Sequence, residues 1–172
     1  MSAGFIRDKL GIKCLILYVV AGVAEPMPMS DIQALTMIDD GIDYFDFSQC
    51  LNELVQTDHL RLDEQQYAIT PKGLKNNEIC QSSLPYSVRL KADRLIQTHR
   101  QELVRRAQVQ ARVERRENGT YTVSLSLSDD VDNVMRLQLM VATKEMAEDL
   151  ARRFQKNPEQ VYARLVSALY GQ

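Results

Sequence analysis

Residues 47–73 read FSQCLNELVQTDHLRLDEQQYAITPKG, and this stretch holds the patterns that decide the fold. Its first part, Phe47 to about Thr57, has apolar residues at spacings of three and four, which predicts an amphipathic helix. Asp46 and Gln49 are spaced as a capping box at the start of that helix. The predicted buried face consists of Phe47, Leu51, Leu54 and Val55.

The second part predicts a hairpin followed by another helix. Leu60-Arg61-Leu62 and Tyr67-Ala68-Ile69 alternate in polarity on either side of the polar residues 63–66. This alternation is typical of two short strands joined by a tight turn. Thr70 can cap the next helix, with Pro71 at its first position, where the missing N–H costs nothing.

Two more helices are predicted before this stretch. The first runs from about Ile6 to Val23 and ends before a Pro-Met-Pro breaker. The second begins at Ser30, which forms a capping box with Gln33, and runs to about Asp39.

The first of these helices also contains an apolar run that must be distinguished from a targeting segment. Residues 14–24 (CLILYVVAGVA) follow basic residues and imitate a signal peptide, but 11 residues are too few to span a membrane. Because the apolar positions recur at helical core spacing, we interpret the run as a retained core helix. The protein is not expected to bind a membrane.

The second half of the chain predicts a different unit. A long basic helix is expected over Tyr86 to about Ala107, with possible buried positions at Val88, Leu95, Ile96, Leu103 and Val104. The apolar period then changes to two, and Asn118-Gly119 predicts a hairpin. Three strands are expected, with these inward residues: Val109, Ala111 and Val113; Tyr121, Val123, Leu125 and Leu127; and Met135, Leu137, Leu139 and Val141.

Two helices are predicted at the end of the chain. Thr143 is the expected cap of the first, with Met146, Ala147, Leu150 and Phe154 inward; Asn157-Pro158 opens the second, with Val161, Leu165, Ala168 and Leu169 inward. We expect both to cover one face of the sheet. The predicted fold class is α+β, with residues 1–82 as a helix-turn-helix unit bearing a hairpin and residues 83–172 as a linker helix and an α+β unit.

Composition and charge limit the possible functions. The 172 residues are 45% hydrophobic and 26% charged, which is the ordinary globular balance. Residues 1–82 carry 6 Lys and Arg against 12 Asp and Glu, whereas residues 83–172 carry 15 against 11. The three cysteines are widely spaced without a CxxC pair, so a reducing, cytoplasmic location is expected.

Motifs for catalysis or cofactor binding are absent from the sequence. Neither histidine has a carboxylate or cysteine at metal-ligand spacing, and there is no GxGxxG, GxxxxGK[ST] or GxSxG. Two acidic clusters, residues 39–46 and 129–132, lack the spacing of a calcium loop and are interpreted as turns and caps. We therefore expect a protein that is not an enzyme and that needs no cofactor or metal.

The order helix-helix-helix-hairpin-helix is that of the winged helix-turn-helix fold. Residues 67–73 (YAITPKG), where the hairpin ends, are similar to the wing exit of bacterial regulators of the MarR and PadR types. With residues 15–18, Tyr44-Phe45 and Asn157-Pro158-Glu159, nearly the whole chain resembles an uncharacterised bacterial family of regulators defined as a domain of unknown function.

This resemblance implies a DNA-binding transcriptional regulator. In such a fold the third helix enters the major groove, so its exposed residues would read base edges. Carried over to this sequence, the DNA-binding residues are Ser48, Gln49, Asn52 and Gln56 on the helix, Gln65 and Gln66 on the wing, and Lys72 and Lys75 against phosphates. The expected partners are double-stranded DNA and a second copy of the chain. The α+β unit of residues 83–172 would serve dimerisation or the sensing of a small-molecule effector whose identity is unknown.

A second interpretation comes from the acidic surface of the first half. Glu53 lies on the reading face, and Asp63 and Glu64 lie at the tip of the wing, although DNA binding depends mainly on Lys and Arg. The alternative is therefore a winged helix that docks another protein and does not bind DNA. A third class, a small-molecule sensor without DNA activity, rests only on the apolar faces of the C-terminal strands, which are more simply a core. Nine basic residues between positions 83 and 117 could supply phosphate contacts in a dimer or form a solvated helix face.

Overall fold

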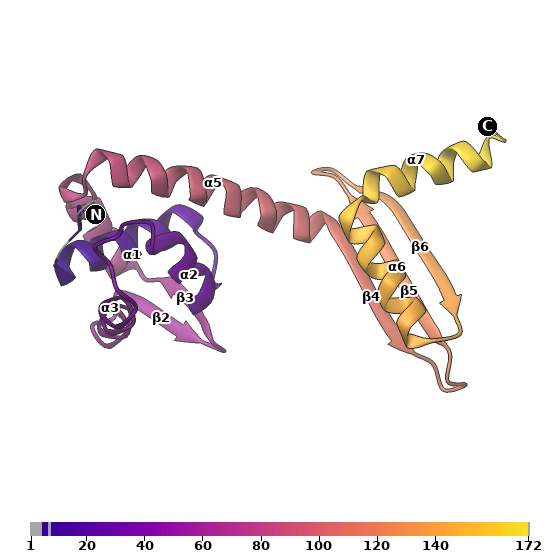
Figure 1. Cartoon of the computed structure of the whole chain (residues 1–172), viewed down its shortest axis with the longest axis horizontal. Coiled ribbons are helices and arrows are strands. Elements are labelled where there is room, and N and C mark those ends of the chain that lie inside the picture. Colours follow the sequence, from indigo (N-terminus) through magenta and orange to yellow (C-terminus); the bar gives the residue numbers. More distant parts are fainter. Residues whose placement is uncertain (1–4, 7, 172) are drawn as a thin grey trace. The chain divides into compact units, whose positions relative to one another are not determined.

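The computed structural model describes residues 5–6 and 8–171 and divides into two compact units, residues 1–100 and residues 101–172 (Figure 1). The helix α5 (Tyr86–Gln108) belongs to the first unit over most of its length and to the second at its end. The α+β class predicted from the sequence is confirmed.

The first unit consists of helices around one small sheet. Its elements are α1 (Lys9–Val23), β1 (Met27–Pro28), α2 (Met29–Thr36), α3 (Tyr44–Gln56), β2 (Leu60–Asp63), β3 (Gln66–Ile69), α4 (Pro71–Cys80), a short 3-10 turn (Gln81–Ser83) and the first part of α5. The strands are antiparallel in the order β1-β3-β2. Met27 of β1 lies opposite Tyr67 of β3, so the sheet connects the segment before α2 to the hairpin.

Helix α1 is the centre of the core of this unit. It packs against α2, α3 and α4, and most of its length is buried. The run that imitates a signal peptide is therefore part of the core, with these buried residues in α1: Ile12, Cys14, Leu15, Ile16, Leu17, Val19, Val20 and Val23.

Two predicted helix caps are wrong. Helix α3 begins at Tyr44 because the side chain of Asp43, and not that of Asp46, caps it by accepting the backbone N–H of Asp46 at 2.9 Å. Helix α2 begins at Met29, so Ser30 lies inside its first turn and does not cap it. The reason is that Pro28 pairs with β3 in an extended conformation and brings the chain directly into the helix.

The predicted ends of the first two helices also shift around Asp39. Helix α1 begins at Lys9 after the cap Asp8, because the N–H groups of Phe5 and Ile6 donate instead to the buried carboxylate of Asp39. Helix α2 ends at Thr36 and not near Asp39, which also accepts the N–H of Gly41 at 3.1 Å. Asp39 thus ties the start of the chain to the turn before α3.

The hairpin and the helix after it are confirmed. Glu64 and Gln65 form the two-residue turn, both with positive φ, as tight hairpins of right-twisted strands require. Thr70 caps α4 by accepting the N–H of Gly73. Gly73 is required because a Cβ there would lie 2.1 Å from the carbonyl oxygen of His59.

The second unit is a three-stranded antiparallel sheet followed by two helices. Strands β4 (Val109–Arg115), β5 (Tyr121–Ser128) and β6 (Asn133–Val141) lie in the order β4-β5-β6, followed by α6 (Lys144–Lys156) and α7 (Pro158–Leu169). Thr143 caps α6 as predicted. The hairpin at Asn118-Gly119 is also confirmed, with a positive φ at Gly119 alone.

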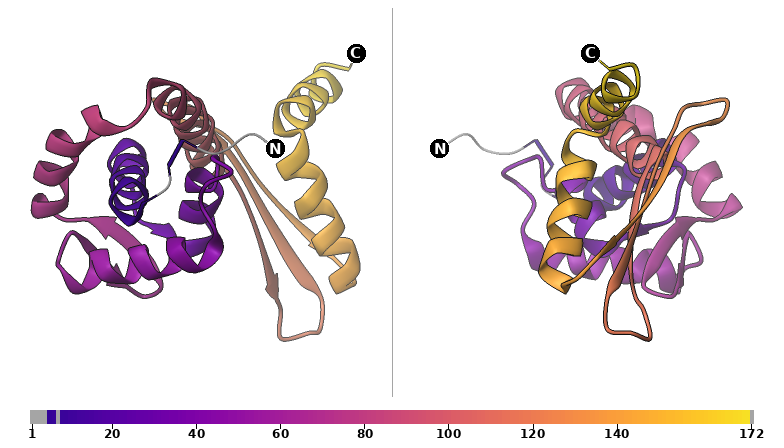
Figure 2. Two further views of the ribbon diagram at one scale, coloured as in Figure 1. Left: turned by 60° about the vertical axis from the view of Figure 1, so that its left-hand side comes forward. Right: turned by 90° about the vertical axis from the view of Figure 1, so that its right-hand side faces the viewer.

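Only α6 covers the sheet, so the prediction of two covering helices is wrong. Helix α6 lies along one face, chiefly over β4 and β5, whereas α7 leaves its end at an angle (Figure 2). Val161 and Leu165 reach the core, but Leu169 is 78% exposed. Other predicted inward residues are also exposed, namely Leu95, Val104, Leu139, Met146 and Ala168.

Candidate functional site

The outer face of α3 brings together four of the eight predicted DNA-binding residues. Their side chains border a shallow hollow of about 650 Å³, whose lining comes from this one helix at helical spacing: Tyr44, Phe45, Ser48, Gln49, Asn52, Glu53 and Gln56. The opposite face of α3 is buried through Phe47, Cys50, Leu51 and Leu54. The amphipathic pattern therefore holds this set of polar side chains outward.

Two lysines of α1 contact this face. The Nζ of Lys13 lies 2.6 Å from the carboxylate of Glu53, and the Nζ of Lys9 donates to Oε1 of Gln49 at 2.6 Å. The Nε2 of Gln49 in turn donates to Glu53 at 2.8 Å. The hydrogen bonds from Lys13 and Gln49 lower the pKa of Glu53, so this acid remains ionised but its charge is compensated by the adjacent lysine.

The four predicted residues on α3 are thus not equivalent. Gln49 already uses both ends of its amide within the unit. Among the described residues, by contrast, no hydrogen bond or ion pair engages Ser48, Asn52 or Gln56. Asn52 and Gln56 are also exposed, so their amide groups can bind a ligand without breaking an internal contact.

Sequence reasoning missed two parts of this surface. It did not assign Lys9 and Lys13 to the site, although their spacing of four residues matches the spacing of Gln49 and Glu53. It also left out the aromatic pair at the start of α3, where the Tyr44 and Phe45 rings meet edge to face with centroids 6.1 Å apart. Phe45 is 83% exposed and Tyr44 47%, so the pair adds apolar surface to an otherwise polar face.

The two predicted wing residues lie at the β2–β3 turn and do not line the hollow. Gln65 is one of the two turn residues and Gln66 begins β3, and both side chains are exposed. The adjacent Asp63 and Glu64 are exposed as well. The tip therefore presents two amides beside two carboxylates.

The two predicted phosphate-binding lysines lie on α4 and differ in their surroundings. The Nζ of Lys72 donates to the carbonyl oxygen of Thr57 at 2.7 Å, at the C-terminal end of α3, where a cation interacts favourably with the helix dipole. Burial, followed by the charge of Lys72, lowers the pKa of the neighbouring His59. Lys75, one turn further along α4, is exposed.

The acidic clusters and cysteines serve the fold. Asp129 accepts the N–H groups of Val131 and Asp132, as Asp39 does for its own three donors. In the part of the chain that the structure describes, no three His, Cys, Asp or Glu side chains gather as a metal site would require. Burial and contact with Cys14 raise the pKa of Cys80 to about 12, which keeps this thiol protonated.

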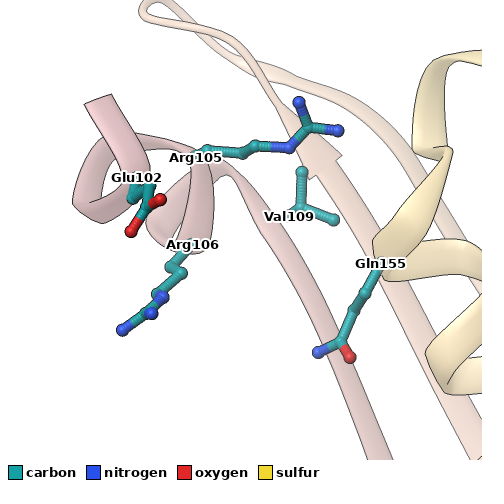
Figure 3. Close-up of a pocket in the computed structure, with 5 residues that line it drawn as sticks. All are labelled: Glu102, Arg105, Arg106, Val109 and Gln155. Carbon is teal, nitrogen blue, oxygen red and sulfur yellow. The ribbon is translucent and has the colours of Figure 1, made fainter. Parts of the chain in front are cut away.

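A second hollow, in the C-terminal unit, measures about 420 Å³ and is lined by Glu102, Arg105, Arg106, Val109 and Gln155 (Figure 3). The two arginines project from α5 in different directions, so they do not converge on one point. Arg105 also lies 3.9 Å from the carboxylate of Glu159. The mixed charges and divergent side chains do not form an anion site.

These features define an α+β protein with a polar helix face as its candidate site. Residues 12–169 match the family described as a domain of unknown function, DUF4364, and the chain belongs to this family. No curated protein and no solved structure matches the chain. Over the described residues, none of the helices combines the length and apolar character needed to cross a bilayer.

Proposed function

We propose that the N-terminal unit is a winged helix that binds double-stranded DNA, with α3 as its recognition helix, and that the protein is a transcriptional regulator. The order α1-β1-α2-α3-β2-β3 and the sheet order β1-β3-β2 support this proposal. In that arrangement α2 and α3 form the helix-turn-helix pair, and the β2–β3 hairpin forms the wing.

The observation that carries the proposal is the set of unengaged polar side chains on α3. Ser48, Asn52 and Gln56 follow one another at intervals of four residues along one face. Asn and Gln can form paired hydrogen bonds with the N6 and N7 atoms of adenine in the major groove. Because Lys13 compensates the charge of Glu53, the one acid on this face need not repel the phosphates strongly.

Contacts to phosphates would come from few residues. The candidates are Lys9 and Lys13 beside α3, and Lys72 and Lys75 on α4. If all four contact phosphates, the slope of log K against log salt would be roughly −3 to −4. This is a shallow dependence, in keeping with the acidic composition of the unit.

The decisive experiment is fluorescence anisotropy with a mixed-sequence duplex between about 50 and 200 mM salt, where a loss of affinity with rising salt reports contacts to phosphates. Combined Asn52→Ala and Gln56→Ala should weaken binding to a preferred sequence by about 10–100-fold, while Gln97→Ala, an exposed glutamine on α5, should leave it unchanged. Lys75→Ala should reduce the salt slope by about one. Absence of salt-dependent binding by the wild-type protein would refute the proposal.

The exposed aromatic pair favours a second candidate function, namely docking of another protein. Phe45 projects from the same face as the polar residues, and Tyr and Phe are enriched where proteins meet. The carboxylates at the wing tip would suit a basic partner. Under this alternative, Asp63→Lys with Glu64→Lys weakens capture of the partner, whereas under the DNA proposal the same change strengthens binding to the duplex.

We further expect the regulator to act in the cytoplasm as a homodimer. Symmetric dimers are the commonest oligomers, and their two-fold axis matches a palindromic operator. The expectation that the protein is not an enzyme and needs no cofactor belongs to the same proposal.

A further inference from the structure

The sheet of the C-terminal unit has two edges, and they differ in how they are covered. At the β4 edge, α6 packs over the inner face, and the outward side chains are polar or charged: Gln110, Arg112 and Glu114. Charged side chains at an edge strand discourage pairing with another strand. The β4 edge is therefore protected.

The β6 edge has little of this protection. Helix α6 packs mainly over β4 and β5, so the inner face of β6 is only partly covered. Large apolar residues of β6 are exposed on both faces: Leu139 is 38% exposed, Val134 41% and Met140 61%. Arg136 is the one charged residue of the strand, and β6 contains no proline. A long apolar edge of this kind can pair with another strand.

The sequence of β6 is self-complementary about its centre. Reading outward from Leu137 in both directions gives Arg136 and Gln138, then Met135 and Leu139, then Val134 and Met140. Two antiparallel copies related by a two-fold axis at Leu137 would therefore oppose polar to polar and apolar to apolar residues over positions 134–140, with the mixed pair Asn133 and Val141 at the ends of the strand. Each Arg136 would face a glutamine amide and not another arginine, so no like charges meet.

The β4 strand provides the contrast. Its central residue is Arg112, so the same two-fold pairing about its centre would place two arginines opposite each other. Like charges directly opposite destabilise an antiparallel pair, which makes β4 a poor partner for itself.

We propose that a second copy of this chain pairs with β6, antiparallel about Leu137, to form a continuous six-stranded sheet across a homodimer. Alternate residues of each β6 strand would exchange backbone hydrogen bonds with its copy. The inner face would bring Leu137 and Leu139 of the two copies together and cover the part of β6 that α6 leaves open. The β6 edge would then be the dimer interface of the proposed regulator. This assignment does not depend on whether the N-terminal unit binds DNA.

The first test is the oligomeric state of the full chain by sedimentation equilibrium, without DNA. Leu139→Lys with Met140→Lys should raise the dimer dissociation constant by at least about 100-fold, because charged side chains block an edge. The matched control is Leu74→Lys with Ile79→Lys on α4, two apolar residues of similar exposure in the other unit, which should leave the dimer intact. Circular dichroism and melting temperature confirm that both variants fold.

A second test fixes the register. In a Cys80→Ser background, Leu137→Cys should give a disulfide-linked dimer under mild oxidation, because residues opposite each other across two strands lie within the Cα separation that a disulfide spans. Arg112→Cys, at the centre of β4, should give none. The inference is overturned by a monomeric wild-type protein, by a dimer that survives the lysine changes in β6, or by equal cross-linking at both positions. Because these outcomes require no nucleic acid, they are distinct from a failure of DNA binding.

Discussion

The two units bury their residues to different extents. Of the twelve largest side chains that are fully buried in the described chain, Phe154 alone belongs to residues 101–172. Helix α1 is enclosed by other elements and can bury residues around much of its circumference, whereas one helix on one face of a sheet leaves the other face and an edge to solvent. The comparison teaches that the first unit has a self-sufficient core and that the second has apolar surface left to cover.

The largest expected change in the free energy of unfolding comes from removing a buried aromatic ring, and it should affect only one of the two units. Phe154→Ala should destabilise residues 101–172 by about 4 kcal/mol, since a fully buried aromatic ring leaves a cavity, and should unfold this unit while residues 1–100 stay folded. NMR or hydrogen exchange would locate the loss. Phe47→Ala is the reciprocal control and should affect the first unit. Loss of both units in either variant would show that they fold as one.

Two glycines allow the cost of a steric collision to be compared with the cost of an unfavourable backbone conformation. Gly73→Ala should cost about 3 kcal/mol, because its Cβ would collide with backbone that cannot move easily. Gly119→Ala, in the β4–β5 turn, has open space around it and should cost only about 1 kcal/mol, from the positive φ that an alanine disfavours. Urea denaturation measures both changes. An equal cost at the two positions would contradict the close approach at Gly73.

Asp39→Asn tests how the start of the chain is held. Burial acts to raise the pKa of Asp39, but the N–H groups of Phe5, Ile6 and Gly41 together lower it below 3.8. Because the folded pKa is the lower one, ionised Asp39 adds stability above about pH 4, and this contribution is lost as the pH falls through the folded value. The Asn variant should be less stable by about 2 kcal/mol at pH 7, since an amide replaces the charged acceptor.

The pH dependence separates this mechanism from a general loss of packing. Urea denaturation of both proteins between pH 7 and pH 3 should show the difference between them shrinking as Asp39 becomes protonated. A difference that stays constant over this range would mean that the charge of Asp39 does not stabilise the fold.

The smallest effect is expected at the end of α7. Leu169→Ser should change the free energy of unfolding by less than about 0.5 kcal/mol in the monomer, because this leucine is already exposed. Leu165→Ser, one turn earlier and packed against the core, should cost about 1 kcal/mol or more. A similar loss for both would mean that α7 packs along its whole length.

The candidate site could be predicted only in part. The grouping of Ser48, Gln49, Asn52 and Gln56 on one face follows from the helical period, since residues spaced by four lie above one another. The engagement of Gln49 could not be predicted in this way, because Lys9 lies 40 residues away and reaches it only through the packing of α1 against α3. Likewise, Lys72 meets the end of α3 through a tertiary contact.

The helix starts show the same limit. The caps Thr70 and Thr143 could be predicted because no other residue nearby competes with either of them as a cap. Before α3, however, Asp43 and Asp46 each offer a side-chain acceptor at cap spacing. The structure shows that Asp43 is the cap. Ser30 does not cap α2, because β1 pairs with β3, a strand that lies far along the chain.

The sequence by itself determined the α+β class, most of the helices and all of the strands in the described residues except β1, because periods of two and 3.6 and the turn residues act over a few neighbouring positions. The tertiary structure decided which apolar faces are covered. The patterns of α6 and α7 both predict an inward face, yet α6 occupies the sheet and α7 is left largely exposed. Burial depends on the area that a partner surface offers, and no local pattern encodes that area.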